Sequence, residues 1–348
     1  MKKLLCLLFA FTVIFSFIAC KQARLEYWEI SESSDSYSEN SADISYESSG
    51  DVSENTLKYT STPLMWKVTG GDSDGTIWLF GSMHIADKTT YPLPNAILEA
   101  FNSCDNLAVE CDITKNVIIP ADFYESITYP DDTTIDQYIS PDIYEAASAL
   151  VSEYYGEDSI EVLARYKPVY WYLLTDGIIA EKSKLSQEYG LDIYFLELAN
   201  DEDKEILEIE SVNLQYKMLS GFSDELQEFL LAGTVFADEE MYLDGLDYQY
   251  EAWKNGDVDE LEELIFPEPP KGYYTQKEIE LIDEYNKEMI YDRNEGMVDV
   301  AIEYLDEDME VFYVVGLAHM LGEQGIVQML ADAGYTVEQI TSYSYDEV

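Results

Sequence analysis

The chain has 348 residues, of which 47% are hydrophobic, and it carries 19 basic against 71 acidic residues for a formal net charge of −52 at pH 7. This length and apolar content suffice to bury a sizeable core, so the chain is not disordered as a whole. The negative charge repels phosphate backbones and anionic lipid headgroups, which makes nucleic acid a poor candidate partner. We interpret the acidity first as a solvated surface, with attraction of cations or basic peptides as the alternative.

The N-terminus is typical of an export signal. Met1-Lys-Lys precedes an apolar run from Leu4 to Ala19, and Phe17-Ile-Ala-Cys20 resembles a bacterial lipobox, with Phe17 where Leu is usual. We therefore predict a signal peptide over residues 1–19 and a lipoprotein anchored through Cys20 to the outer face of a bacterial cell membrane. The alternatives are a free secreted protein and a retained membrane helix.

The next segment is polar and acidic. Residues 29–57 contain no Lys or Arg and are dense in Ser, Asp, Glu and Asn. Such a segment cannot bury enough apolar surface to offset its ordering entropy, so residues 20–58 are predicted to be an anchored, disordered tether. A single folded domain is predicted over residues 59–348. Its two cysteines, Cys104 and Cys111, are expected to be free, partly buried thiols.

The folded part begins with a predicted hairpin of strands 64–68 and 76–80, joined by a Gly-rich turn. A helix is expected over 96–104 and a second buried strand over 106–110. This succession of strand, helix and strand fits a βαβ unit.

Residues 115–308 are predicted to be mainly helical, because apolar residues recur there at three and four spacing. Two short pieces, 192–196 and 205–209, instead favour strands. The predicted helices are 143–155, 169–180, 212–231 and 279–305.

The C-terminal part returns to alternating elements, with strands predicted over 311–315 and 335–340 and a helix over 325–333. Strands thus gather at the two ends of the domain. The predicted fold is α/β (α+β), with a central mixed sheet built from N- and C-terminal strands and a large helical insertion covering it.

Both histidines of the chain, His84 and His319, end the same pattern of five mostly apolar residues followed by Gly-x-x-His. Functional positions of open α/β sheets lie just beyond the carboxyl ends of the strands, and both motifs are predicted there, as is Glu110. The glycine permits a tight turn or a close backbone approach after the strand. Strands 76–80 and 311–315 should therefore lie close in one sheet.

Two imidazoles and one carboxylate can hold Zn, Mn, Fe or Co and leave coordination positions open for water and substrate. Glu110 is chosen for its position, and Asp112 is the alternative carboxylate. A structural interpretation, in which each histidine is simply hydrogen-bonded at the end of the sheet, competes with the metal site.

The residues Leu79-Phe-Gly-Ser-Met-His84, Leu107-Ala-Val-Glu110 and Val315-Gly-Leu-Ala-His-Met-Leu-Gly322 resemble the TraB/GumN family, which includes pheromone-shutdown proteins and the TIKI metalloproteases. The resemblance covers residues 62–342. Further positions share it, namely Gly190-Leu-Asp192 with Ala199, Ile209-Glu210-Ser211 with Gln215, and Arg293-Asn294.

The resemblance implies a divalent-metal site served by His84, His319 and Glu110, and in some members peptide-bond hydrolysis. Arg293 is interpreted either as a group that binds a substrate carboxylate or stabilises an oxyanion, or as the partner of nearby acids. Glu210 is a candidate general base or partner of a histidine, with a solvated carboxylate as its alternative.

The leading hypothesis is an exported, lipid-anchored, metal-dependent hydrolase that acts on a peptide or other acyl substrate, with Glu110 or Glu210 assisting proton transfer from the attacking water. Its rival is a non-catalytic surface protein that sequesters a peptide signal or a metal or haem ligand. A third interpretation is an acidic surface protein whose site is degenerate.

Overall fold

The structure is a computed structural model, and it describes residues 61–71, 73–115, 121–267 and 271–343. The predicted signal peptide, Cys20 and the acidic tether lie outside these residues. Within the described ranges, no helix combines the length and the apolar composition needed to cross a membrane.

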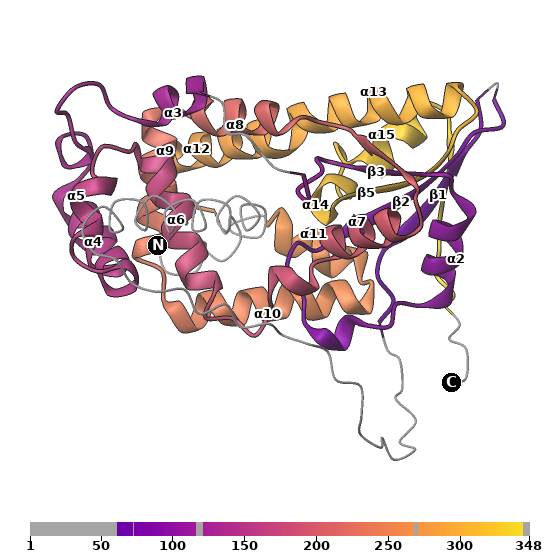
Figure 1. Cartoon of the computed structure of the whole chain (residues 1–348), viewed down its shortest axis with the longest axis horizontal. Coiled ribbons are helices and arrows are strands. Elements are labelled where there is room, and N and C mark those ends of the chain that lie inside the picture. Colours follow the sequence, from indigo (N-terminus) through magenta and orange to yellow (C-terminus); the bar gives the residue numbers. More distant parts are fainter. Residues whose placement is uncertain (1–60, 72, 116–120, 268–270, 344–348) are drawn as a thin grey trace, which may run out of the picture.

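A six-stranded mixed sheet forms one end of the molecule, in the order β4-β3-β5-β2-β1-β6 (Figure 1). Neighbours among β4, β3, β5 and β2 are parallel, whereas β1 is antiparallel to both β2 and β6. The predicted mixed sheet from both ends of the chain, with α/β composition, is confirmed. The strands are β1 (Met65–Thr69), β2 (Thr76–Ser82), β3 (Asn106–Val109), β4 (Glu205–Glu208), β5 (Glu310–Gly316) and β6 (Thr336–Gln339).

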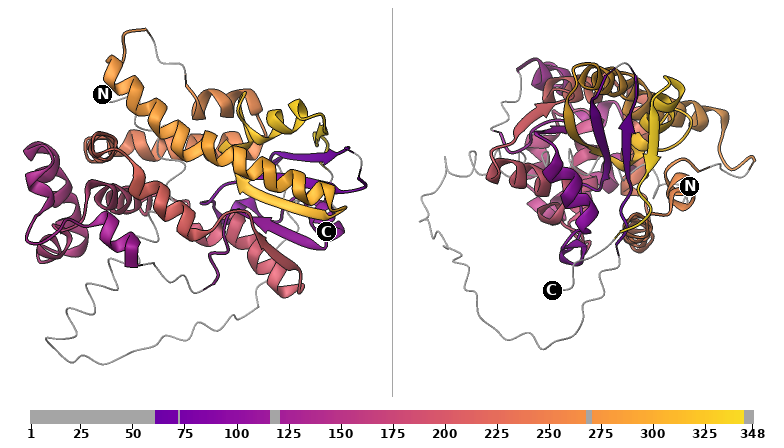
Figure 2. Two further views of the ribbon diagram at one scale, coloured as in Figure 1. Left: turned by 90° about the horizontal axis from the view of Figure 1, so that it is seen from above. Right: turned by 90° about the vertical axis from the view of Figure 1, so that its right-hand side faces the viewer.

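Most helices lie between β3 and β5 in the chain, and many of them form the other end of the molecule (Figures 1 and 2). Figure 1 also shows α13 and α15 on one side of the sheet and α2 and α7 on the other. The helices are α2 (Asn95–Ser103), α3 (Ala121–Ile127), α4 (Pro141–Tyr155), α5 (Ser159–Leu163), α6 (Pro168–Ala180), α7 (Leu191–Asp201), α8 (Val212–Gly221), α9 (Asp224–Val235), α10 (Glu239–Asn255), α11 (Val258–Ile265), α12 (Gln276–Asn286), α13 (Asp292–Asp306), α14 (Leu317–Met320) and α15 (Ile326–Asp332).

Helix α6 is the core of the helical end. Every one of its residues from Pro168 to Ala180 is buried, as expected for a helix that is apolar all round. It packs against α4, α9 and α10. The hydrophobic pattern predicted this helix to within one residue, and Pro168 lies in its first turn.

One predicted element is wrong. Residues 192–196, predicted as a strand, lie in helix α7. The buried residues of α7 include Leu191, Phe195 and Ala199, which recur every four residues and so follow a helical period. The window of five residues from Asp192 to Leu196 is too short to show that period.

Two long predicted helices are divided. The stretch 212–231 contains α8 and α9, and Ser223 begins the second by accepting a hydrogen bond from Leu226 N at its side-chain oxygen. The stretch 279–305 contains α12, a π-helical turn over Lys287–Tyr291, and α13. Such turns are frequent at functional sites, and this one directly precedes Arg293 and Asn294.

The helical part is tied to the segment that follows β2. Leu191 N donates to Met83 O at 3.0 Å, and Ala86 pairs with Ser186 in an isolated antiparallel bridge. From α10, Trp253 Nε1 donates to Gly81 O at 2.8 Å. The first Gly-x-x-His segment is therefore held by the insertion as well as by the sheet.

Candidate functional site

The strand register brings the two Gly-x-x-His motifs together. Strands β2 and β5 are parallel neighbours with Gly81 opposite Val315 and Ser82 opposite Gly316, and β3 lies on the other side of β5. His84 follows β2, His319 lies in the short helix α14 after β5, and Glu110 follows β3. Three chemically active side chains thus come from the carboxyl ends of three adjacent strands.

The motif glycines lie in tightly packed surroundings. A β-carbon on Gly316 would lie 3.3 Å from both Glu110 Oε1 and His84 Nε2, so a side chain there would intrude between these groups. A β-carbon on Gly81 would lie 2.8 Å from Leu317 Cδ1, which is closer than real contacts allow. Glycine at these two positions leaves room for the neighbouring side chains.

Glu110 lies at the centre of the site. Its Oε1 accepts a hydrogen bond from Gly316 N at 2.8 Å and lies 3.9 Å from His319 Nε2. Its Oε2 accepts from Arg293 Nη2 at 2.5 Å and from Gln215 Nε2 at 3.3 Å. One oxygen of the carboxylate therefore faces the histidines and the other faces the guanidinium group.

The His84 ring is oriented by a carboxylate. His84 Nδ1 lies 2.8 Å from Asp192 Oδ2, and Asp192 Oδ1 accepts a hydrogen bond from Ser82 Oγ at 2.8 Å. Because a carboxylate accepts, Nδ1 of His84 carries the proton and Nε2 keeps its lone pair. Asp192 is the second residue of α7, and Gly190 lets α7 begin beside His84, since a β-carbon there would lie 2.3 Å from His84 O.

The His319 ring is oriented by an amide. His319 Nδ1 lies 2.6 Å from Asn294 Oδ1, while Asn294 Nδ2 donates to Gln324 O at 2.6 Å. That second bond fixes which way the Asn294 amide points, so its oxygen accepts from the imidazole. Both histidines therefore hold the proton on Nδ1 and turn Nε2 toward the space beside Glu110.

Arg293 links Glu110 to Glu210. Arg293 Nε donates to Glu210 Oε1 at 2.9 Å, Nη2 donates to Glu210 Oε2 at 2.8 Å, and Nη1 donates to Met289 O at 3.0 Å. Gln215 Nε2 also donates to Glu210 Oε2, at 3.0 Å. Of the two interpretations of Arg293, the geometry favours the one in which it pairs with nearby acids.

Asp112, the alternative to Glu110, faces elsewhere. It accepts hydrogen bonds from Thr114 N at 3.0 Å and Thr114 Oγ1 at 2.5 Å, and it lies 3.4 Å from Lys115 Nζ. These are the contacts of a residue that begins a turn. Of the two carboxylates, Glu110 is the one that lies beside the histidines.

The pKa values follow from burial and from the neighbouring charges. Burial acts to raise the pKa of Glu110, but the Arg293 guanidinium, the two histidines and the Gly316 N–H together outweigh it and lower the pKa to about 2. Burial, followed by Arg293, lowers the pKa of His319 to about 3. Burial also acts to lower the pKa of His84, but Asp192, and then Glu110, outweigh it and raise the pKa above its usual value.

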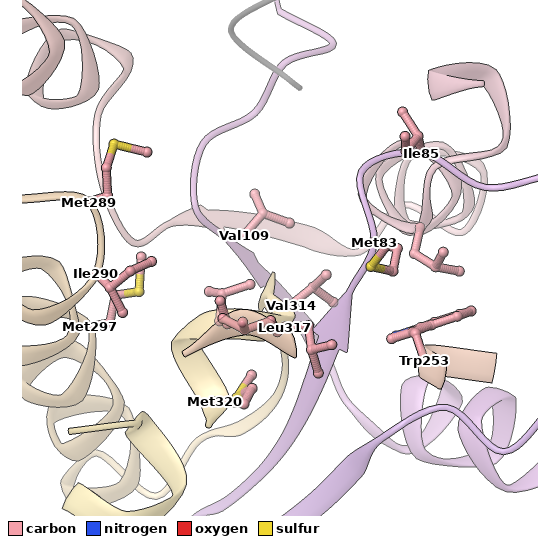
Figure 3. Packing of buried hydrophobic residues seen from close by; sticks show 14 of the residues in the cluster. Met83, Ile85, Val109, Trp253, Met289, Ile290, Met297, Val314, Leu317 and Met320 are labelled. Atoms are coloured by element: carbon pink, nitrogen blue, oxygen red, sulfur yellow. The ribbon is translucent and has the colours of Figure 1, made fainter. Parts of the chain in front are cut away.

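Apolar side chains surround these polar groups. Figure 3 shows Val109, Val314 and Leu317 together at the strand ends, with Met83 towards one side and Met297 towards the other. The side chain of His319 is 2% exposed and that of Glu110 is 12% exposed. Charges in such surroundings interact more strongly than in water.

No group of three or more His, Cys, Asp or Glu side chains in the described parts of the chain is arranged so that it could hold a metal ion as it stands. The donors converge, but Glu110 is engaged by Gly316 and Arg293. Cys104 and Cys111 are both free and buried, as predicted, and burial raises the pKa of the Cys104 thiol to about 12.

A sequence model of the TraB/PrgY/gumN family matches residues 64–339, which is most of the chain. The chain belongs to the TraB/PrgY/gumN family. Two curated relatives come from Xenopus tropicalis. Metalloprotease TIKI2 is 22% identical over 302 residues, covering 75% of this chain and 57% of that protein, and metalloprotease TIKI1 is 21% identical over 305 residues, covering 76% and 59%. No solved structure matches.

This chain thus spans somewhat over half the length of the curated relatives it matches. The family match includes both Gly-x-x-His motifs and all the residues that surround them. At this identity the named activity of the relatives is a property of those proteins, and its transfer to this chain is a proposal.

Two residues of the site were missed in the sequence, and three others were noted only as positions of family resemblance. Nothing in the sequence distinguishes Ser82 or Gln324 as a site residue, because a serine inside a motif and a backbone carbonyl group are both commonplace. Asp192, Asn294 and Gln215 were noted without a role. The Gly-Leu-Asp sequence at 190–192 is typical of a helix start with an acidic first turn, and this would have identified α7 and placed Asp192 at its N-terminus.

Proposed function

We propose that the chain is a metal-dependent hydrolase of the metallopeptidase type, in which His84, His319 and Glu110 hold one divalent ion, Zn, Mn, Co or Fe. The observation that carries the proposal is the pair of hydrogen bonds at the Nδ1 atoms of the two histidines. Metal-ligating histidines almost always donate the other ring N–H to a carboxylate or carbonyl oxygen. The only two histidines of the chain both do so.

The donor set suits such an ion. Two imidazole nitrogens and a carboxylate oxygen are the ligands of catalytic Zn sites and of related Mn, Co and Fe sites. Two ligands bound at ~2.1 Å in tetrahedral geometry lie about 3.4 Å apart. Glu110 Oε1 and His319 Nε2 are 3.9 Å apart, so a small movement of either side chain would bring them to ligand spacing.

The charges also favour a cation. The site gathers three carboxylates, those of Glu110, Glu210 and Asp192, against the single guanidinium of Arg293. All four side chains are mostly buried, and an excess of buried negative charge is unfavourable unless a cation or a proton offsets it. A divalent ion beside Glu110 Oε1 would offset this excess.

A divalent ion held there would polarise a carbonyl group as a Lewis acid and would acidify water near neutral pH. Other side chains of the protein would hold the proposed ligands of this ion in position. Asp192 and Asn294 fix the two rings, while Arg293 and Gln215 hold the Glu110 carboxylate in place. Arg293 donates hydrogen bonds to both oxygens of Glu210, and in this proposal Glu210 positions Arg293.

Metal analysis tests the proposal. The full chain is supplied with Zn, Mn, Co and Fe in turn, dialysed, and its metal content measured by mass spectrometry, beside His84→Ala and His319→Ala. We expect one ion per chain in the wild type and none in either variant. Glu110→Gln should lower the affinity at least about tenfold, as loss of one ligand does, whereas the matched Asp112→Asn should not change it. An absence of stoichiometric metal under every supply would sink the proposal.

The substrate is proposed to be a peptide or another acyl compound. The metal-loaded protein is incubated with a diverse peptide library and the products are read by mass spectrometry. Cleavage that both histidine substitutions abolish supports the hydrolase. Retained metal without any product would instead favour the rival function, a surface protein that sequesters its ligand.

We further propose that the domain acts outside the bacterial cell, held to the membrane by lipid on Cys20. The support is the sequence from Met1 to Cys20, which has the order of an export signal followed by a lipobox-like segment. Cys20→Ser should move the protein from the membrane fraction to the medium. Unchanged membrane attachment of this variant would contradict the anchor.

A further inference from the structure

Glu110 and Glu210 form a closely held pair of carboxylates. They follow the neighbouring parallel strands β3 and β4, and Glu210 N donates to Glu110 O at 2.9 Å. The Oε2 atoms of both accept hydrogen bonds from the same nitrogen, Arg293 Nη2, at 2.5 and 2.8 Å. Two buried carboxylates this close repel each other strongly unless a positive charge lies between them.

Arg293 supplies that charge and does so permanently. A guanidinium group stays protonated in proteins, and its planar fork matches carboxylate geometry. Each of its three nitrogens donates inside the protein, to Glu110, to Glu210 or to the carbonyl of Met289. The Arg293 side chain is 8% exposed, so solvent contributes little to its stabilisation.

The Glu110 carboxylate is shared between two places that suit a cation. Its Oε1 faces His319 and His84 across Gly316, and its Oε2 faces the guanidinium. In two-metal hydrolases, ions about 3.5–4 Å apart are joined in a similar way, each on one side of the reacting oxygens. Here a side-chain cation occupies one of the two places.

We propose that Arg293 replaces a second metal ion at this site, so that the protein binds a single divalent ion on the histidine side of Glu110. This inference rests on the proposed function for the identity of the first ion. It assigns Arg293 to holding the carboxylate pair and not to contact with substrate. Removing the guanidinium should open a second cation site between Glu110 and Glu210.

The test counts Mn²⁺ ions bound by the full chain. Wild type, Arg293→Ala and a matched control, Lys115→Met, are loaded with Mn²⁺, dialysed and measured by elemental mass spectrometry and electron paramagnetic resonance. Lys115 lies 3.4 Å from Asp112 and 3.1 Å from Glu208, so its loss removes the same charge from another pair of carboxylates, one of which, Glu208, is 36% exposed to solvent. The control also measures ions gathered loosely by the acidic surface.

We expect Arg293→Ala to bind one more Mn²⁺ ion than the wild type, with the spin coupling of two neighbouring ions, and Lys115→Met to match the wild type. Adding Glu210→Gln to Arg293→Ala removes the carboxylate surplus and should return the count to that of the wild type. A folded Arg293→Ala variant that binds no additional ion would overturn the inference, and so would a coupled ion pair in the wild type.

The outcomes separate this inference from the proposed function. If the wild type binds no ion and Arg293→Ala binds one, the proposed function fails and the role of Arg293 stands. If both bind one ion, the proposed function stands and the role of Arg293 fails. Should Arg293→Ala not fold without metal, we expect Mn²⁺ to restore its folding, and a variant that stays unfolded with Mn²⁺ present would overturn the inference.

Discussion

The two histidines end the same sequence pattern, but they lie in different surroundings. His84 follows β2 in a loop that the helical insertion holds, and its partner is the carboxylate of Asp192. His319 lies in α14 directly after β5, and its partner is the neutral amide of Asn294. The partners differ by one negative charge although the hydrogen bonds are alike.

Because of this difference, the two imidazole rings differ in basicity although they belong to one site. The Asp192 carboxylate makes the His84 ring more basic and raises its pKa, whereas burial and then Arg293 lower the pKa of His319 to about 3. In the proposed site, His84 would be the stronger electron donor and His319 the fixed, neutral one. A repeated motif therefore does not imply a repeated role.

The largest expected effect comes from Glu110, which serves both histidines. Glu110→Ala leaves the buried Arg293 with a single carboxylate, and breaking a buried ion pair in this way should lower the free energy of unfolding by about 3 kcal/mol. The matched variant Asp112→Ala loses hydrogen bonds within a turn and should cost about 1 kcal/mol. Urea unfolding of both variants measures the difference, and equal losses would contradict the central position of Glu110.

The next largest effect is expected from a substitution that disturbs only the surroundings of His84. A β-carbon in Gly190→Ala would lie 2.3 Å from His84 O, so we expect a loss of about 2–3 kcal/mol in unfolding free energy and a displaced His84 ring. Gly296→Ala, in α13 beside the His319 partner Asn294, meets nothing within 4 Å and should stabilise its helix slightly. The His84 resonances should move in the first variant only, and unmoved resonances there would refute the close approach.

The pH dependence of the metal-free protein should separate the two rings. Folded His319 stays neutral down to a pKa of about 3, while the unfolded chain takes up a proton below its usual pKa of 6.5. Between about pH 7.5 and 5.5 this group alone should lower the free energy of unfolding by about 1.4 kcal/mol. His84 has the opposite sign, because its raised pKa stabilises the folded state below the usual value and the gain is lost as the pH rises through the folded pKa.

His319→Asn should therefore be more stable, relative to the wild type, at pH 5.5 than at pH 7.5, and His84→Asn should be less stable. Urea unfolding in the presence of a chelator at both pH values measures this. If the stability of both variants, relative to the wild type, changed in the same direction between the two pH values, the contrast between the Asp192 and Asn294 partners would be refuted.

The smallest expected effect comes from Ser82, whose hydroxyl group donates a hydrogen bond to Asp192. Ser82→Ala removes one buried hydrogen bond to Asp192 Oδ1 and should lower the free energy of unfolding by about 1 kcal/mol, with a shift of the His84 resonances but not of those of His319. Ser220→Ala is the control, because Ser220 Oγ bonds an exposed carbonyl in α8 and should have almost no effect. Equal shifts of both histidines in Ser82→Ala would count against the separation of the two sides.

Much of the sheet could be predicted because its strands are buried and carry continuous apolar runs. Strand β5 is buried from Val311 to Gly316, and β2 beside it ends in the same motif. The convergence of His84, His319 and Glu110 followed from the rule that carboxyl ends of parallel strands share one edge. Family resemblance added Arg293 and Asn294.

The partners of these residues could not be predicted in the same way. Asp192 was placed in a strand, and a strand offers no reason for its carboxylate to face His84. The choice between Glu110 and Asp112 depended on which way the chain turns after β3, which adjacent acidic residues do not reveal. Arg293 could have faced substrate or acid, and its direction depends on the Met289 carbonyl in the π-helical turn and on the position of β4, which the sequence does not reveal.

The most direct test of the account is anomalous diffraction from a crystal of the protein grown with Mn²⁺ or Zn²⁺. The account predicts one strong peak at the carboxyl edge of β2 and β5, within bonding distance of His84 Nε2, His319 Nε2 and Glu110 Oε1, with Arg293 still donating to Glu110 Oε2. A crystal saturated with metal that shows no peak between the two histidines, and peaks only on surface carboxylates, would contradict it.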